Sequence, residues 1–255
     1  MFTQTKIREI ILVMEELFLN TKDRVNIALN WYNTGHKSVI IICPGWFMTK
    51  DSKAFSLLAE KLSEKLDVIV MDFRGHGRSS GFYTFTSKEL FDLEAAVDFA
   101  KSHYEKVFLA GFSLGGGLVI LHSALKNDVD KIIAVSPPSD FYKIENCMWH
   151  PNAWIPTFKK FEPKRWVSVR PSLLIHKKTR PLDVVEKITV PTLFVAGRHD
   201  VTVKPWHTEL LYQKAVCEKK LEIFENGIHA EDLFLDEPER FVKMCLDWVD
   251  RKSVV

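Results

Sequence analysis

A serine stands between two glycines in the stretch Gly-Phe-Ser-Leu-Gly at residues 111–115, and this spacing suits nucleophilic chemistry. The residues before it, 106–110, form an apolar run that predicts a buried strand, and residues 116–125 have the composition of a helix. On a tight strand-to-helix turn, larger side chains two positions before or after the serine would collide with neighbouring backbone. We therefore predict that Ser113 projects a nucleophilic hydroxyl from such a turn.

A serine hydroxyl is a weak nucleophile unless a base takes its proton, and the base needs a third group that orients it. His229 follows the last expected strand and is the candidate base. Asp200 follows the preceding expected strand and is the candidate third group, while Asp140 is a rival at an earlier strand end. We favour Asp200 because of its place after the strand at 192–197 and its motif Gly-Arg-His-Asp. Loops after parallel strands meet at one edge of a sheet, where α/β sheets place their sites.

Acyl transfer through a serine also needs two backbone N–H groups that stabilise the developing oxyanion. Leu114, directly after the serine, is one expected donor. The other is expected from the loop Pro-Gly-Trp-Phe at 44–47, with Trp46 as the donor. Phe47 in the same loop is a candidate contact for substrate.

Strands and helices alternate along most of the chain, which predicts a mostly parallel sheet covered by helices on both faces. A β-hairpin over residues 10–32 would add an antiparallel edge. The apolar run at 39–43 predicts a strand that is buried on both faces. Further strands are expected at 68–73, 107–112, 132–136, 192–197 and 221–225, and helices at 51–65, 87–104, 116–125, 203–216 and 237–251.

Residues 141–190 interrupt this alternation, because they form a connection that is too long for a bare loop. We interpret them as a cap inserted into a single domain that spans residues 1–255. The segment contains ten basic and four acidic residues, which indicate either a basic lid for anionic substrates or a solvated outer face. Its aromatic residues are candidates for a substrate pocket or for the core of the cap, namely Trp149, Trp154 and Trp166.

The composition excludes several classes of protein. A net charge of +2 gives no electrostatic case for binding nucleic acid. The four cysteines have neither disulfide-framework nor metal-ligand spacing, which indicates reduced thiols, a cytoplasmic location and no metal. Cys43 is expected to be a small buried residue. No signal peptide or membrane-spanning run is expected, and the protein is expected to be a monomer or a homodimer.

Taken together, these motifs resemble the serine hydrolases of the α/β-hydrolase superfamily. The resemblance runs through nearly the whole chain and includes the turn at 111–115, the loop Cys-Pro-Gly-Trp at 43–46, the stretch Asp-Phe-Arg-Gly-His-Gly-Arg-Ser at 72–79, Asp200 and His229. The stretch at 72–79 is similar to that of monoacylglycerol lipase-like and lysophospholipase-like esterases, and the modest cap to that of cinnamoyl and feruloyl esterases. Many members have His-Gly where this chain has Pro44-Gly45, a change that retains the backbone donor.

The resemblance implies an eight-stranded α/β-hydrolase fold with a small cap, and no cofactor. The expected activity is hydrolysis of a small to medium acyl or aryl ester through an acyl-enzyme on Ser113. The same machinery could serve an acyltransferase, a thioesterase or an amidase, because acyl-enzyme chemistry does not specify the second nucleophile. A binding protein without catalytic activity is a further alternative, which the intact set of Ser113, Asp200 and His229 disfavours.

Overall fold

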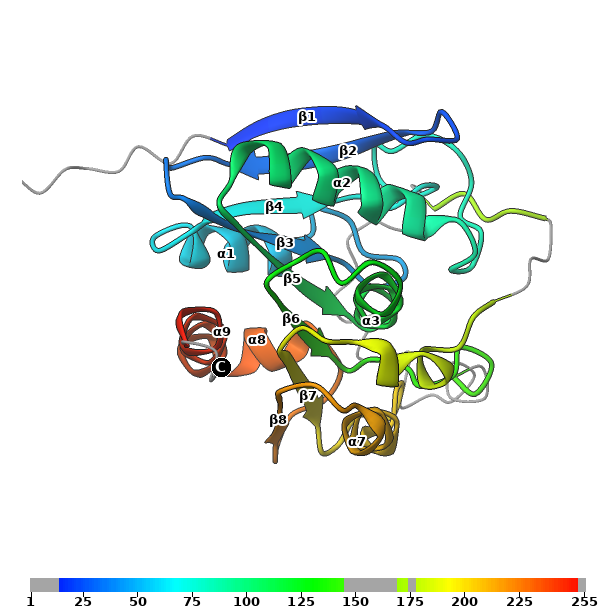
Figure 1. The fold of residues 1–255 in the computed structure, drawn as a ribbon, viewed down its shortest axis with the longest axis vertical. Coiled ribbons are helices and arrows are strands. Elements are labelled where there is room, and N and C mark those ends of the chain that lie inside the picture. The colour runs from blue at the N-terminus through cyan, green and yellow to red at the C-terminus, as the bar shows by residue number, and fades with distance from the viewer. Residues whose placement is uncertain (1–13, 145–168, 174–177, 252–255) are drawn as a thin grey trace, which may run out of the picture.

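The computed structural model describes residues 14–144, 169–173 and 178–251, which form a sheet covered by helices on both faces (Figure 1). These residues contain an eight-stranded sheet in the order β1-β2-β4-β3-β5-β6-β7-β8. Pairing is antiparallel from β1 to β2 and from β2 to β4, and parallel between all the other neighbours. This confirms the predicted sheet. The strands are β1 (Met14–Asn20), β2 (Asn26–Tyr32), β3 (Ser38–Cys43), β4 (Asp67–Met71), β5 (Lys106–Phe112), β6 (Lys131–Val135), β7 (Thr192–Gly197) and β8 (Lys219–Phe224).

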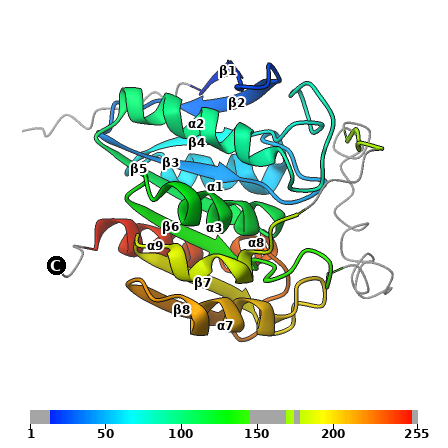
Figure 2. The same ribbon diagram turned by 45° about the vertical axis from the view of Figure 1, so that its right-hand side comes forward.

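Two sets of helices cover the two faces of this sheet (Figures 1 and 2). A hydrophobic core lies beneath each set. The first core contains apolar side chains of α2, α3 and α7, and the second contains those of α1, α8 and α9. The helices are α1 (Lys53–Leu62), α2 (Glu89–His103), α3 (Leu114–Lys126), α7 (Pro205–Lys214), α8 (Asp232–Asp236) and α9 (Pro238–Asp250), with 3-10 turns η1 (Pro181–Asp183) and η2 (Val185–Lys187).

The apolar pattern explains how these layers form. In β3, every residue from Val39 to Cys43 is buried, as expected of a parallel strand with helices on both faces. In α1, Phe55, Leu58 and Leu62 form one buried stripe at helical spacing. Burial of these matched faces fixes the register of the strands, because a slip of one residue would move each side chain to the opposite face.

Several boundaries differ from the expected ones, and two of the differences lie near predicted site residues. Helix α3 begins at Leu114 rather than at residue 116, because the N–H of Gly117 already donates to the carbonyl of Ser113 at 3.1 Å. The helix therefore starts directly after the serine. Before α9, which begins at Pro238, a separate short helix α8 occupies residues that the sequence pattern left as a loop. Residues 10–13 of the expected first strand lie outside the described residues.

The insertion proposed for residues 141–190 is described only in part, and the single-domain organisation stays a prediction. Residues 169–173 lie against the core, where the N–H of Tyr83 donates to the carbonyl of Arg170 at 2.8 Å. The N–H of Ser172 donates in turn to the carbonyl of Tyr83 at 2.7 Å. The insertion is therefore bound to the segment that follows the 72–79 stretch.

Arg74 joins the N-terminal hairpin to helix α2. Its guanidinium is almost fully buried and lies 2.7 Å from a carboxylate oxygen of Asp23, in the hairpin turn, and 2.7 Å from one of Asp92, in α2. Forked hydrogen bonds of this kind hold both partners in a defined geometry. The antiparallel edge of the sheet is thereby fixed to the helical layer.

Candidate active site

The predicted nucleophile, Ser113, lies between β5 and α3 with φ 52° and ψ −113°, a strained conformation for a residue other than glycine. A Cβ added to Gly111 would lie 2.2 Å from the carbonyl oxygen of Gly115. A Cβ added to Gly115 would lie 2.0 Å from the carbonyl oxygen of Cys43. Glycine is therefore required at both positions, for the reason that the sequence pattern predicted. The side chain of Ser113 is half-buried at the turn.

The loop after β3 lies directly beside this turn. A Cβ added to Gly45 would lie 3.2 Å from the Cβ of Ser113, so Gly45 allows the loop to approach the serine. The loop turns at Trp46 and Phe47, where Phe47 has φ +61° and the N–H of Met48 donates to the carbonyl of Gly45 at 3.2 Å. Leu114 is the first residue of α3, where backbone N–H groups have no partner within the helix. Of the two predicted donors, Leu114 directly follows Ser113, and Trp46 follows Gly45, whose backbone approaches the serine.

Asp200 and His229 form a hydrogen-bonded pair. The Nδ1 of His229 lies 2.7 Å from the Oδ2 of Asp200, whose side chain is fully buried, whereas the imidazole is 20 % exposed. The other oxygen of Asp200 accepts hydrogen bonds from the N–H groups of Thr202 and Val203, at 2.8 and 2.9 Å. A carboxylate at this distance favours the tautomer of the neutral ring that has its proton on Nδ1, and in that tautomer Nε2 can act as a base.

The rival carboxylate, Asp140, has other partners. Its Oδ1 accepts a hydrogen bond from the N–H of Tyr142 at 2.9 Å, and its Oδ2 lies 3.7 Å from the guanidinium of Arg180. The contact with His229 is made by Asp200, the carboxylate that the sequence favoured.

The end of β6 ties the serine turn to the histidine loop. The N–H of Ser113 donates to the carbonyl of Val135 at 2.8 Å. The next residue, Ser136, accepts at its Oγ a hydrogen bond from the N–H of Ala230 at 3.1 Å. The predicted nucleophile and the residue that follows the predicted base are thus bound to two consecutive positions at the end of β6. All the parallel strands end at this edge of the sheet (Figure 2). Ser136 was missed by sequence reasoning, because its partner is 94 positions away.

An aromatic row continues from the loop after β3. The ring of Trp46 lies 4.2 Å from that of Phe47 and 6.3 Å from that of Tyr83, measured between centroids, and Tyr83 lies 4.6 Å from Phe85. The ammonium of Lys178, from the insertion, lies 5.5 Å from the centre of the Phe85 ring. Phe47 was predicted from the sequence, whereas Tyr83 and Phe85 were not. The other predicted substrate contacts lie outside the described residues, namely Trp149 and Trp154.

Cys43 and His76, two further residues near the site, are packed in the protein interior. Cys43 is fully buried, its Sγ lies 3.8 Å from the sulfur of Met71, and burial raises the pKa of its thiol. His76 packs edge-on against Tyr83, and burial lowers its pKa to about 4. A thiol and an imidazole held neutral in this way are not poised as a nucleophile and a base. In the described part of the chain, no group of three or more His, Cys, Asp or Glu side chains is arranged to hold a metal ion.

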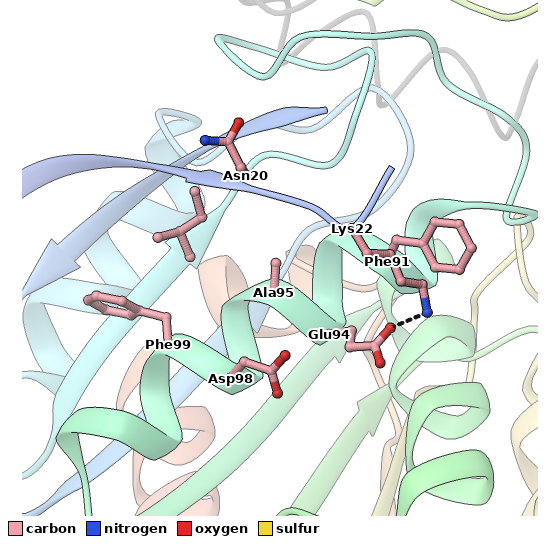
Figure 3. A pocket seen from close by; sticks show the side chains of 8 residues that line it. Asn20, Lys22, Phe91, Glu94, Ala95, Asp98 and Phe99 are labelled. Carbon is pink, nitrogen blue, oxygen red and sulfur yellow. Dashed lines mark hydrogen bonds and ion pairs between the residues drawn. The ribbon is translucent and has the colours of Figure 1, made fainter. Parts of the chain in front are cut away.

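A separate groove lies between the hairpin and α2, with a volume of about 340 Å³ (Figure 3). Glu94 binds Lys22 there at 2.7 Å, and Phe91 and Phe99 line the apolar part. The groove contains none of the predicted site residues, and β2, β4 and β3 separate its edge strand β1 from β5. It is therefore distinct from the site at Ser113.

Comparison with known proteins identifies the family to which this chain belongs. The model of the alpha/beta hydrolase family matches residues 40–244, and the chain belongs to this family. The alpha/beta hydrolase domain-containing protein WAV2 of Arabidopsis thaliana is 26% identical over 204 residues, which cover 76% of this chain and 63% of that protein. The uncharacterized protein YqkD of Bacillus subtilis is 28% identical over 206 residues, which cover 76% of this chain and 65% of that protein. The chain thus spans less than two thirds of the length of these relatives.

Solved structures share the fold. The esterase Pf2001 of Pyrococcus furiosus superimposes with a TM-score of 0.78 at 20% identity, covering 98% of this chain and 96% of that one. An esterase from Exiguobacterium antarcticum superimposes with a TM-score of 0.73 at 20% identity, and the match covers 93% of this chain and 100% of that one. Among the described residues, no helix has the length and apolar character needed to cross a membrane.

Proposed function

We propose that the protein is a carboxylic ester hydrolase that works through a serine acyl-enzyme. Ser113 attacks the ester carbonyl, while His229 takes the hydroxyl proton and later donates it to the leaving alcohol. Asp200 orients the imidazole and stabilises its protonated form. The N–H groups of Trp46 and Leu114 bind the oxyanion. Water, activated by His229, then releases the acid and restores the free serine.

One observation carries the proposal: a buried carboxylate holds an imidazole at 2.7 Å, at the same sheet edge as a serine in a strained turn. The backbone contacts from Ser113 to Val135 and from Ala230 to Ser136 link these parts. A binding protein would gain nothing from the strain at Ser113, which costs about 1–3 kcal/mol. A strained residue that exposes a nucleophile is instead expected of a hydrolase.

The substrate proposed is a small to medium acyl or aryl ester. The aromatic row of Trp46, Phe47, Tyr83 and Phe85 offers apolar surface beside the proposed oxyanion loop. Names of similar proteins agree with ester chemistry. Besides the two esterases above, a Proteus mirabilis protein named as a pimeloyl-[acyl-carrier protein] methyl ester esterase is 31% identical over 39% of this chain and 36% of that protein.

Hydrolysis of p-nitrophenyl butyrate tests the proposal. Ser113→Ala should lower kcat at least about 1000-fold, because the remaining groups cannot form the acyl-enzyme. His229→Gln should have a comparable effect. Ser102→Ala is the matched control, since Ser102 is an exposed serine on α2, and its kcat should equal that of the unchanged protein.

Full activity of Ser113→Ala would overturn the proposal. Product analysis with a competing alcohol or thiol separates hydrolysis from acyl transfer, because a transferase would form the new ester or thioester in preference to the free acid. A panel of p-nitrophenyl esters of increasing acyl length, with methyl ferulate and a monoacylglycerol, would define the substrate class.

A further inference from the structure

Asp72 directly follows β4, and its carboxylate binds two loops at once. Its Oδ1 accepts a hydrogen bond from the backbone N–H of Lys50 at 2.7 Å. Its Oδ2 accepts one from the backbone N–H of Arg78 at 3.0 Å. The residue is fully buried. Lys50 belongs to the segment 44–52, which also carries Trp46, so the carboxylate ties the proposed oxyanion loop to the end of β4.

Lys50 is held at its side chain as well as at its backbone. Its ammonium is almost fully buried and lies 2.8 Å from a carboxylate oxygen of Glu16, in β1, and 2.9 Å from one of Asp51. The far end of the 44–52 segment is therefore fixed to β1 and to β4. Any displacement of Lys50 would leave a buried charge or a buried N–H group without its partner, which is costly.

The turn at 72–79 is shaped around the Asp72 carboxylate. Gly77 has φ +48°, and a Cβ added to it would lie 2.1 Å from the Oδ2 of Asp72. Burial raises the pKa of Asp72 to about 6, so the carboxylate is kept in a place where its charge is disfavoured. At neutral pH the ionised form still predominates, and a charged acceptor makes a stronger hydrogen bond than a neutral one.

We propose that Asp72 is a positioning residue for the oxyanion loop, acting through the backbone of Lys50 to hold the N–H of Trp46 beside Ser113. The inference rests on the proposed function, because it assigns the loop a role in stabilising the oxyanion. Oxyanion donors must be fixed before the reaction, since reorganisation during the reaction would cancel their benefit. Loss of Asp72 should therefore affect the chemical step more than substrate binding.

A matched control lies in the same turn. The hydroxyl of Ser79 donates to the carbonyl of Asp72 at 2.7 Å and accepts a hydrogen bond from the N–H of Ala28 at 2.8 Å. Ser79 is as buried as Asp72, but these contacts lead to β2 and not to the 44–52 segment. Ser79→Ala therefore removes buried hydrogen bonds without touching Lys50. Asp72→Asn removes the negative charge and leaves one acceptor oxygen for the N–H groups of Lys50 and Arg78, so that one of them faces an amide N–H₂ and the other has a weaker acceptor.

Amide hydrogen exchange tests the anchor independently of activity. In the unchanged protein, the amide of Lys50 should be protected from exchange, and an unprotected amide would overturn the inference even if the Asp72→Asn variant failed to fold. In Asp72→Asn, peptides that cover residues 44–52 should exchange at least about tenfold faster than in Ser79→Ala. Equal exchange in the two variants would also overturn it.

Kinetics with p-nitrophenyl butyrate test the consequence for catalysis. Asp72→Asn should lower kcat about 10- to 100-fold with KM changed less than about threefold, since loss of a whole oxyanion donor typically costs 100-fold or more. Ser79→Ala should keep kcat within about threefold of the unchanged protein. Equal kcat in both variants would contradict the positioning role. An inactive unchanged protein would instead contradict the proposed function, while the exchange data would still decide whether Asp72 anchors the loop.

Discussion

Ser113, the proposed nucleophile, has a strained backbone conformation. Its backbone has φ 52° and ψ −113° where β5 ends and α3 begins, and its N–H donates to the carbonyl of Val135. Glycine would adopt this conformation with little penalty, yet glycine has no side chain that could act as a nucleophile. The strain at this position is therefore expected to be visible in the free energy of unfolding.

Ser113→Gly and Ser113→Ala should both be inactive but should differ in stability. Because glycine tolerates φ 52° and alanine does not, Ser113→Gly should have a free energy of unfolding about 1–2 kcal/mol higher than that of Ser113→Ala. Urea denaturation at neutral pH measures the difference. Equal stability of the two variants would show that the turn is not strained in solution.

At the scale of elements, a buried histidine joins the loop after β6 to α7. The Nδ1 of His207, in α7, accepts a hydrogen bond from the N–H of Ser139 at 3.1 Å and lies 2.7 Å from the Ser139 hydroxyl. Burial lowers the pKa of His207 to about 4. The folded protein therefore keeps this imidazole neutral at a pH where the unfolded chain takes up a proton.

Stability should fall as the pH drops from about 6.5 towards 4, because in this range the unfolded state binds more protons than the folded state. For a pKa lowered to about 4, the loss from His207 at pH 5 is about 2 kcal/mol relative to neutral pH. His207→Gln should remove this part of the pH dependence, and His199→Gln, at an exposed position, should not. Urea denaturation at pH 7.5 and 5 gives the comparison, and an identical pH dependence in both variants would contradict the argument.

At the scale of the whole molecule, one sheet separates two hydrophobic cores. Buried polar contacts hold the β1–β2 hairpin against the rest of the protein. The contact of Arg74 with Asp23 and Asp92 fixes the β1–β2 hairpin. This hairpin forms the opposite side of the sheet from β8. If the chain unfolds as one cooperative domain, a substitution in the hairpin should lower the free energy of unfolding of the whole protein.

Asp92→Ala should lower the free energy of unfolding by about 3–5 kcal/mol, because it removes the fully buried one of the two carboxylates that pair with the buried guanidinium of Arg74. Tryptophan fluorescence and far-UV circular dichroism should shift to lower urea concentration together. Separate transitions for the two signals would contradict a single domain spanning residues 1–255.

The sequence pattern predicted the parallel sheet well because the central strands are continuous apolar runs, such as residues 39–43. It also placed Ser113, Asp200 and His229 after the correct strands, since motif and order suffice for that. The contacts of Ser136 and Asp72 could not be predicted in this way. Their partners, Ala230 and Lys50, are distant in sequence, and only the folded backbone brings these N–H groups to them.

Covalent labelling with a fluorophosphonate tests the central claim most directly, because the reagent reacts with a serine activated by a base and an oxyanion hole. Intact-mass spectrometry should show one adduct, and peptide mapping should place it on Ser113. The adduct should be absent from Ser113→Ala, strongly reduced in His229→Gln and unchanged in Ser102→Ala. No adduct on the unchanged protein, or an adduct that persists in Ser113→Ala, would contradict the account.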